Sequence, residues 1–188
     1  AKHPHAAPGV LFQLELWYED GTREHIISDG TESCELSYIL CSDLFQGEKQ
    51  DFTQRQQIPQ PVALRDYPMN ILRAQPMDPI RPVAELPARR VFRSPKGEWI
   101  VDFGQVLAGR ARVLLNTPQG TTVTLEYFEE LDCDGNYLNT MFAPQRDVVV
   151  TGDLPFVHEA LFTFHGFRYL RVTGLDIVRK EDFTAVLL

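Results

Sequence analysis

Five carboxylates lie close together in the second half of the sequence and are the first candidates for catalysis: Glu126, Glu129, Glu130, Asp132 and Asp134. Two carboxylates can hydrolyse a glycosidic bond when they face each other across the sugar, roughly 5 to 9.5 Å apart. Neighbours on one strand and its turn instead point to opposite faces or into solvent. We interpret the cluster as the solvated end of a strand, with an opposed catalytic pair as the alternative.

The stretch from Asp132 to Asn136, Asp-Cys-Asp-Gly-Asn, has the spacing with which a calcium-binding loop begins. Such a loop also needs further oxygen ligands and a bidentate glutamate at a fixed distance downstream, and this sequence lacks them. Asp-Gly is typical of a tight turn between two strands. The sequence therefore favours a hairpin turn over a calcium site.

A dense group of polar and aromatic residues runs from His165 to Tyr169, His-Gly-Phe-Arg-Tyr. A histidine can act as a general acid or base, but no Ser, Cys or Asp partner is recognisable beside His165. We expect a bulge at Gly166, a carboxylate partner for Arg168, and a hydrogen bond that holds His165 inside the fold. A ligand contact or an interdomain contact is the alternative.

Trp17 falls on the polar face of an alternating segment, residues 12–18. An exposed tryptophan can stack on a sugar or anchor a partner. A neighbouring strand or domain that covers this face would explain Trp17 equally well. The sequence favours burial against a neighbour and leaves the binding role open.

The three cysteines, Cys34, Cys41 and Cys133, are an odd number without CxxC spacing. This pattern argues against a zinc knuckle or a redox pair, and a reducing compartment is the simpler interpretation. The sequence also lacks GxGxxG, P-loop, HExxH and GxSxG motifs. From the residues alone we assign no catalytic, cofactor-binding or metal-binding residue, no cofactor, and no substrate-binding residue.

Composition excludes several classes of protein. The chain has 188 residues, of which 44% are hydrophobic and 23% charged, which is typical of a globular protein and not of disorder, collagen or a disulfide scaffold. A net charge of -8 argues against nucleic acid and anionic membrane surfaces as partners. The sequence has no apolar run of the roughly 18 residues that a membrane helix needs, and it does not open with a signal peptide. A cytoplasmic location is favoured for this segment, with any export signal outside it.

Alternating apolar residues predict strands through most of the chain. Asp20-Gly21 predicts a hairpin between residues 12–18 and 23–28. Between residues 98 and 188 we expect about seven short strands and one helical turn near residues 180–182, with strands at residues 98–103, 110–115, 121–128, 147–151, 161–164, 168–173 and 183–188. Regular short strands predict an all-β fold, an antiparallel β-sandwich or jelly roll.

Residues 59–95 hold eight of the 13 prolines and mark a candidate domain boundary. Proline removes a backbone donor, so we expect a crossing segment with at most short edge strands, near residues 70–74. The sequence starts at Ala1 without an initiator methionine and ends on an apolar run, Ala185 to Leu188. These ends lead us to expect a segment of a longer protein.

Several separated motifs resemble, in order and spacing, the β-sandwich domain that precedes the catalytic barrel of bacterial α-L-rhamnosidases. The similarity runs from Asp78 to Leu188. It is carried by Asp102-Phe103-Gly104-Gln105, by Pro118 to Leu125, by Glu130 to Asn136, by Phe162 to Tyr169 with Val172 to Gly174, and by Asp182 to Ala185. Upstream, Gln13 to Leu16, Asp20 to Thr22, Ser42-Asp43 and Gly47-Glu48 resemble the end of that family's N-terminal β domain.

The resemblance implies three ranges: residues 1–58 as the C-terminal part of an N-terminal β domain, 59–95 as a proline-rich linker, and 96–188 as the β-sandwich. It also implies a parent protein that hydrolyses terminal α-L-rhamnose from rhamnosides. The catalytic carboxylates of that family lie in an (α/α)6 barrel that follows this domain, and nothing in this sequence matches the barrel. We therefore carry over no catalytic residue.

Three functions follow as hypotheses. The first is a non-catalytic accessory fragment of a glycoside hydrolase, with the missing (α/α)6 domain of the same chain and a rhamnose-containing carbohydrate as partners. The alternative is a stand-alone carbohydrate-binding or adhesion module, argued by analogy from the fold and Trp17. The third, an intact enzyme within these residues, is the least favoured.

Overall fold

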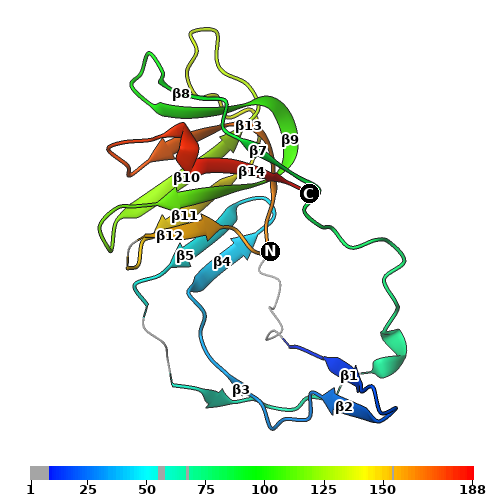
Figure 1. The fold of residues 1–188 in the computed structure, drawn as a ribbon. Coiled ribbons are helices and arrows are strands. Elements are labelled where there is room, and N and C mark those ends of the chain that lie inside the picture. Colours follow the sequence, from blue (N-terminus) through cyan, green and yellow to red (C-terminus); the bar gives the residue numbers. More distant parts are fainter. Residues whose placement is uncertain (1–8, 55–57, 67, 154) are drawn as a thin grey trace. The chain divides into compact units, whose positions relative to one another are not determined.

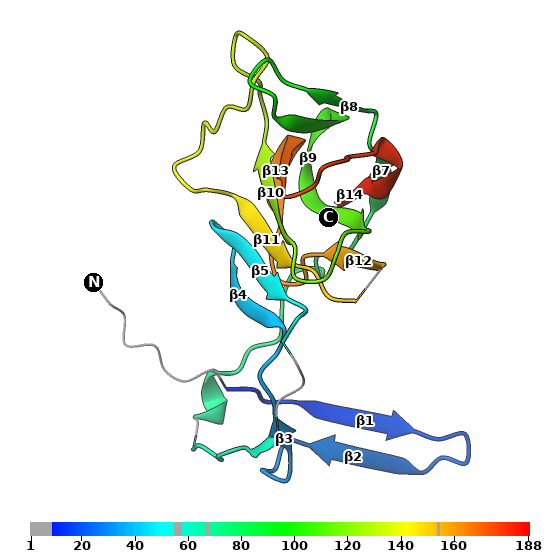
Figure 2. The same cartoon turned by 90° about the vertical axis from the view of Figure 1, so that its left-hand side faces the viewer.

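The computed structural model describes residues 9–54, 58–66, 68–153 and 155–188. These described residues fall into two compact units, one within residues 9–36 and 58–74 and the other within residues 37–54 and 75–188 (Figures 1 and 2). Residues 37–54 fall in the second unit because their strand β5 (Gly47–Asp51) pairs with it. The domain ranges 1–58, 59–95 and 96–188 stay a prediction about the longer protein.

The first unit contains the hairpin expected from Asp20-Gly21. Strands β1 (Gln13–Trp17) and β2 (Arg23–Ile27) pair antiparallel, and Gly21 adopts φ +83° in the turn. Short strands β3 (Ser33–Cys34) and β6 (Gln60–Pro61) form a second pair. The edge strand expected near residues 70–74 is absent from the described residues, which instead form the 3-10 turn η1 (Met69–Ile71) after Pro68. The predicted hairpin is therefore confirmed, and the prediction of an edge strand near residues 70–74 is wrong.

The second unit is a single ten-stranded sheet, in which the main path runs β4-β5-β11-β10-β13-β9-β14-β7 while β8 and β12 also pair with β9. The bounds are β4 (Ile39–Asp43), β5 (Gly47–Asp51), β7 (Ala84–Pro87), β8 (Arg90–Arg93), β9 (Trp99–Leu115), β10 (Thr122–Phe128), β11 (Arg146–Val150), β12 (Phe156–Glu159), β13 (His165–Thr173) and β14 (Phe183–Leu187). The short 3-10 turn η2 (Lys180–Asp182) is where the one-turn helix was expected. Every pair is antiparallel except the parallel pair β5–β11. The predicted all-β class is confirmed.

Strand β9 organises the sheet because both of its halves pair with β13 while their other neighbours differ. Its first residues pair with β8 and with the second half of β13, and its last residues pair with β12 and β14. The register with β13 is irregular between Asp102 and Leu107, and Gly104 in this stretch adopts φ +87°, which favours glycine. The curved β9 folds the sheet onto itself (Figure 2), and this fold creates an inside for the alternating apolar residues.

The main core lies on the inner face. It contains the alternating sets expected from the sequence, with full burial of Val101, Ala111, Val113, Leu115, Val123 and Leu125. A second, smaller cluster of Ile100, Phe128 and Tyr169 covers the opposite face of the same strands. Both faces of the first half of β9 are therefore covered.

Three details differ from the expected strand pattern. Strand β9 is continuous through Gly104 and Gly109, and β13 begins at His165 instead of after it. Residues 161–164 form no strand, because the Leu161 and Phe162 amides donate to the Glu48 carboxylate instead of to a ladder. Strand β12 was not expected, since its buried side chain is a histidine, His158.

Among the described residues, no helix is long and apolar enough to cross a membrane.

Candidate functional site

The acidic cluster near residue 130 does not form an opposed pair across open space. Glu126, on β10, accepts hydrogen bonds from Arg171 of β13 at 2.6 Å, and the same guanidinium contacts Glu98 at 2.9 Å. Glu129 and Glu130 are exposed beyond the end of β10. Arg171 therefore binds both Glu126 and Glu98, the two partly buried carboxylates in this region.

Asp132 is the organising residue of its turn. Its Oδ1 accepts from the backbone amides of Asp134 and Asn136 at 3.0 and 2.7 Å, and these bonds lower the pKa of the carboxyl, led by that from Asn136. Gly135 adopts φ +88°, and Leu131 and Tyr137 form a bridge across the turn. The hairpin-turn prediction is confirmed. No group of three or more His, Cys, Asp or Glu side chains in the described ranges is arranged to hold a metal ion.

The two contacts expected around His165 are present. Arg168 donates to both oxygens of Asp102, at 3.0 and 3.3 Å, and His165 Nε2 lies 3.4 Å from Asp147 Oδ1. The strand irregularity falls between Phe167 and Tyr169, and not at Gly166 as expected. His165 is 2% exposed, so solvent does not reach its ring.

Asp147 is the centre of a polar network inside the second unit. Its side chain is fully buried and accepts from three elements: the Glu48 amide at 2.8 Å, the Tyr127 hydroxyl at 2.6 Å, and His165. The Tyr127 and His165 rings stack with centroids 4.0 Å apart. One carboxylate therefore joins β5, β10, β11 and β13.

Glu48 and His158 extend the network to β12 and the segment that follows it. The Glu48 carboxylate accepts from the Leu161 and Phe162 amides, both at 3.0 Å, and from Gln50 Nε2 at 2.6 Å. Gln50 Oε1 lies 2.9 Å from His158 Nδ1. Glu48, Gln50 and His158 are at most 1% exposed.

Burial and hydrogen bonding oppose each other in this network. Burial alone would raise the pKa of Asp147, but hydrogen bonds from His165 and Tyr127 and the nearby imidazole hold it below the usual value. Burial, with the Asp147 charge, raises the pKa of Tyr127 well above the usual value. Burial also lowers the pKa of His158. At neutral pH these directions favour an ionised Asp147, a neutral Tyr127 and a neutral His158.

The network has acids and bases but no access for a substrate. Its side chains hold strands and a connecting segment together, which is a structural task. Sequence reasoning did not single out Asp147, Gln50 or His158, since each looked like an ordinary strand residue. Glu48 was noted only as part of the Gly47-Glu48 motif.

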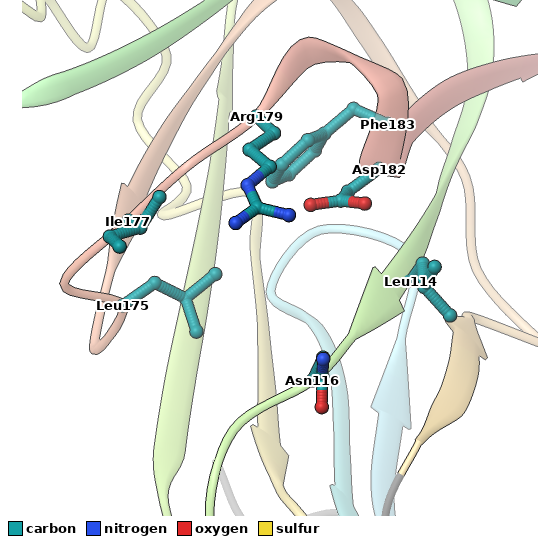
Figure 3. Close-up of a pocket in the computed structure, with 7 residues that line it drawn as sticks. All are labelled: Leu114, Asn116, Leu175, Ile177, Arg179, Asp182 and Phe183. Atoms are coloured by element: carbon teal, nitrogen blue, oxygen red, sulfur yellow. The ribbon is translucent and has the colours of Figure 1, made fainter.

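An open pocket lies elsewhere on the second unit (Figure 3). Its polar lining consists of Asn116, Arg179 and Asp182, and its apolar lining of Leu114, Leu175, Ile177 and Phe183. Its volume is about 140 Å³, below the roughly 300–1,000 Å³ of sites for drug-sized ligands. Only a small ligand would fit.

Trp17 is exposed, with 64% of its surface accessible, and the Arg23 guanidinium lies 3.6 Å above its ring. The favoured burial of this side chain is therefore not observed within its unit. Cys34, Cys41 and Cys133 are exposed free thiols.

The second unit is thus a folded, mostly antiparallel sheet whose buried carboxylates are held by internal hydrogen-bond donors. The chain belongs to the bacterial α-L-rhamnosidase family, because the family's concanavalin-like domain matches residues 92–188 and its N-terminal domain matches residues 1–84. The resemblance found in the sequence and the predicted β-sandwich are both confirmed.

Several relatives of this chain are named alpha-L-rhamnosidase. An alpha-L-rhamnosidase of Streptomyces avermitilis is 36% identical over 182 residues, which cover 89% of this chain and 18% of that protein. The solved structure of a Streptomyces avermitilis alpha-L-rhamnosidase complexed with L-rhamnose matches 94% of this chain and 19% of its own, with a TM-score of 0.82 and 31% identity. The native Aspergillus terreus enzyme matches 94% of this chain and 22% of its own, with a TM-score of 0.82 and 27% identity. The chain spans about a fifth of the length of these relatives.

Proposed function

We propose that this chain is a non-catalytic accessory region of an α-L-rhamnosidase. The longer protein would hydrolyse terminal α-L-rhamnose from rhamnosides, and its (α/α)6 catalytic domain would be the main partner of this region. This chain covers only about a fifth of the length of its relatives, which supports a longer protein.

One observation carries the non-catalytic role. Hydrolysis of a glycoside needs two carboxylates that face each other with a sugar between them. In the described part of the second unit, the Leu161 and Phe162 amides donate to Glu48, and the Glu48 amide and the Tyr127 hydroxyl donate to Asp147. Arg171 binds Glu126, and Arg168 binds Asp102. Each of these four acids is already committed to holding the fold.

The test is an assay of the purified chain with an aryl α-L-rhamnoside. We expect no release of the aryl alcohol above buffer, while a full-length relative such as the Streptomyces avermitilis enzyme in the same buffer cleaves the substrate. Rhamnosidase activity that co-elutes with the purified chain in independent preparations would refute the proposal. Sequencing the flanking coding region is a second test, since a helix-rich segment of barrel size should follow.

The exposure of Trp17 favours a second candidate, a carbohydrate-binding module. Trp17 and the Arg23 guanidinium form an exposed aromatic and cationic surface on the first unit. Titration with rhamnosides should then change tryptophan fluorescence in the wild type and not in Trp17→Phe. An unchanged signal at millimolar sugar would count against this candidate.

A further inference from the structure

The open pocket of the second unit is built from the end of β9 and from the segment that connects β13 to β14. Leu114 and Asn116 come from β9 and the residue after its end, and Arg179 and Asp182 come from the connecting segment and η2. Figure 3 shows the Arg179 and Asp182 side chains on one side of the pocket, with Leu175 and Ile177 on another. Leu114 lies beyond Asp182 and Phe183 lies between Arg179 and Asp182, so the apolar wall opposite the charged side chains consists of Leu175 and Ile177.

The polar wall has free hydrogen-bonding capacity. None of the side chains of Asn116, Arg179 and Asp182 makes a hydrogen bond or an ion pair with another described residue, although all three line one pocket. By contrast, Arg110 and Arg112 of the same β9 both donate to Glu159 at 2.6 Å. Arginine supplies only donors, aspartate only acceptors, and asparagine both.

The apolar wall is exposed but rigidly supported. Ile177 is 68% exposed, and the neighbouring Val178 is buried in the main core. Gly174, with φ +89°, starts this segment close against the Thr122 carbonyl, where a β carbon would not fit. The segment that carries the wall is therefore held in place before any ligand arrives, which lowers the entropy lost on binding.

The chemistry of the two walls identifies a class of ligand. Vicinal hydroxyls both donate and accept, and they match a set of one donor, one acceptor and one amide. An apolar wall opposite them suits an unhydroxylated edge, such as the methyl group of a deoxy sugar. One positive and one negative side chain disfavour a charged ligand, and the small volume limits the ligand to one ring.

We propose that this pocket binds a single 6-deoxyhexose ring. The choice of L-rhamnose as the probe rests on the proposed function, whereas the ligand class rests on the pocket itself. Affinity would be weak, in the millimolar range, because the pocket is open and small. This site differs in position and chemistry from the Trp17 surface of the first unit.

The test is a titration of the ¹⁵N-labelled chain with L-rhamnose, followed by NMR. We expect saturable shifts of the Asn116 side-chain amide, of Arg179 Nε and of the Ile177 backbone amide. L-Mannose, which carries a hydroxymethyl group where rhamnose has a methyl group, should bind more weakly. Arg179→Met and Asp182→Ala should each weaken binding about tenfold or more, since each removes hydrogen bonds to a charged group.

Arg146→Met, at an exposed arginine outside the pocket, is the matched control and should bind like the wild type. Absence of saturable shifts with L-rhamnose at millimolar concentration, or tighter binding of L-mannose, would overturn the proposal. So would binding that survives Arg179→Met in a folded protein. The wild-type comparison of the two sugars remains decisive if a variant fails to fold. The aryl rhamnoside assay tests the accessory role separately, so the two proposals can fail independently.

Discussion

The substitution Asp147→Ala tests whether the buried polar network holds the second unit together. The fully buried carboxylate accepts from the Glu48 amide at 2.8 Å and from the Tyr127 hydroxyl at 2.6 Å, with His165 at 3.4 Å. Alanine leaves these groups without their acceptor and without room for bulk water. The variant should therefore lose stability well beyond the loss of a single surface contact.

The magnitude follows from counting the groups left unpaired. A buried donor without a partner costs about 1–3 kcal/mol. The Glu48 amide and the Tyr127 hydroxyl both lose a short bond, and the longer His165 contact adds less. We expect the free energy of unfolding to fall by about 3–5 kcal/mol, a large share of the about 5–15 kcal/mol typical of a domain.

Urea unfolding followed by tryptophan fluorescence measures this loss. The chain has two tryptophans, Trp17 in the first unit and Trp99, which packs against the main core of the second. A Trp17→Phe background leaves Trp99 as the reporter of the second unit alone. Asp78→Ala, at an exposed aspartate, is the control and should change stability by less than about 0.5 kcal/mol.

Tyr127→Phe completes a double-mutant cycle with Asp147→Ala. If the hydroxyl acts mainly through Asp147, the two losses should not add, with a coupling energy of about 1–2 kcal/mol. A loss below about 1 kcal/mol for Asp147→Ala, or fully additive losses, would refute the view that this carboxylate joins the strands.

Three further predictions concern single positions. Burial lowers the pKa of His158 below its usual 6.5, so the unfolded chain takes up protons before the folded one as the pH falls below 6.5. The free energy of unfolding should therefore decline below this pH, and it should decline less in His158→Asn. Urea midpoints that fall equally between pH 7 and pH 5 in the wild type and the variant would contradict this. Gly174→Ala should lower the free energy of unfolding by about 3 kcal/mol or more, because the new β carbon would meet the Thr122 carbonyl. Gly120→Ala, where φ is also positive but no atom lies near, should lower it by about 1 kcal/mol. Equal shifts in melting temperature for the two variants would show that the contact with Thr122 is unimportant. Arg168→Met should lower the free energy of unfolding by about 2–3 kcal/mol at neutral pH, because the buried Asp102 carboxylate loses a partner. Burial would raise the pKa of Asp102, but the arginine holds it below 3.8, so the difference in stability between variant and wild type should shrink below pH 3.8. A loss that does not depend on pH would argue against the ion pair.

The sequence predicted the parts of the fold that depend on local pattern. Strict alternation in residues 110–115 and 121–128 places apolar side chains inward because successive strand residues face opposite ways. Asp20-Gly21 and Asp134-Gly135 mark turns because glycine there adopts positive φ. Each of these signals lies within a few residues of the feature that it predicts.

The same reasoning failed where distant residues decide the structure. Residues 161–164 alternate like a strand, yet two of their amides bond to Glu48, more than a hundred positions earlier. Strand β12 was missed because the side chain that it buries is His158, which becomes tolerable inside only through its contact with Gln50. Local periodicity carries no information about such partners.

The residues that made the family recognisable are now explained by the fold. Asp102 of the Asp-Phe-Gly-Gln motif is 2% exposed and accepts from Arg90, Arg168 and the Gly104 amide, where the register of β9 with β13 becomes irregular. Glu48 of the Gly-Glu motif ties the segment after β12 to β5. Both acids belong to recurring motifs, and in each the carboxylate is taken up by internal donors.

A motif acid that is fully hydrogen-bonded inside the fold has little capacity left for a substrate. A catalytic acid needs a proton that can reach the leaving group, and a nucleophile needs an open path to the anomeric carbon. Asp102 and Glu48 meet neither condition, because their oxygens already accept from arginines or from backbone amides. Arg179 and Asp182 differ in kind, since they lie at an open pocket with unused donors and acceptors. Any contact that this region makes with a sugar should therefore be sought where polar groups are unpaired, and not where the family motifs are densest.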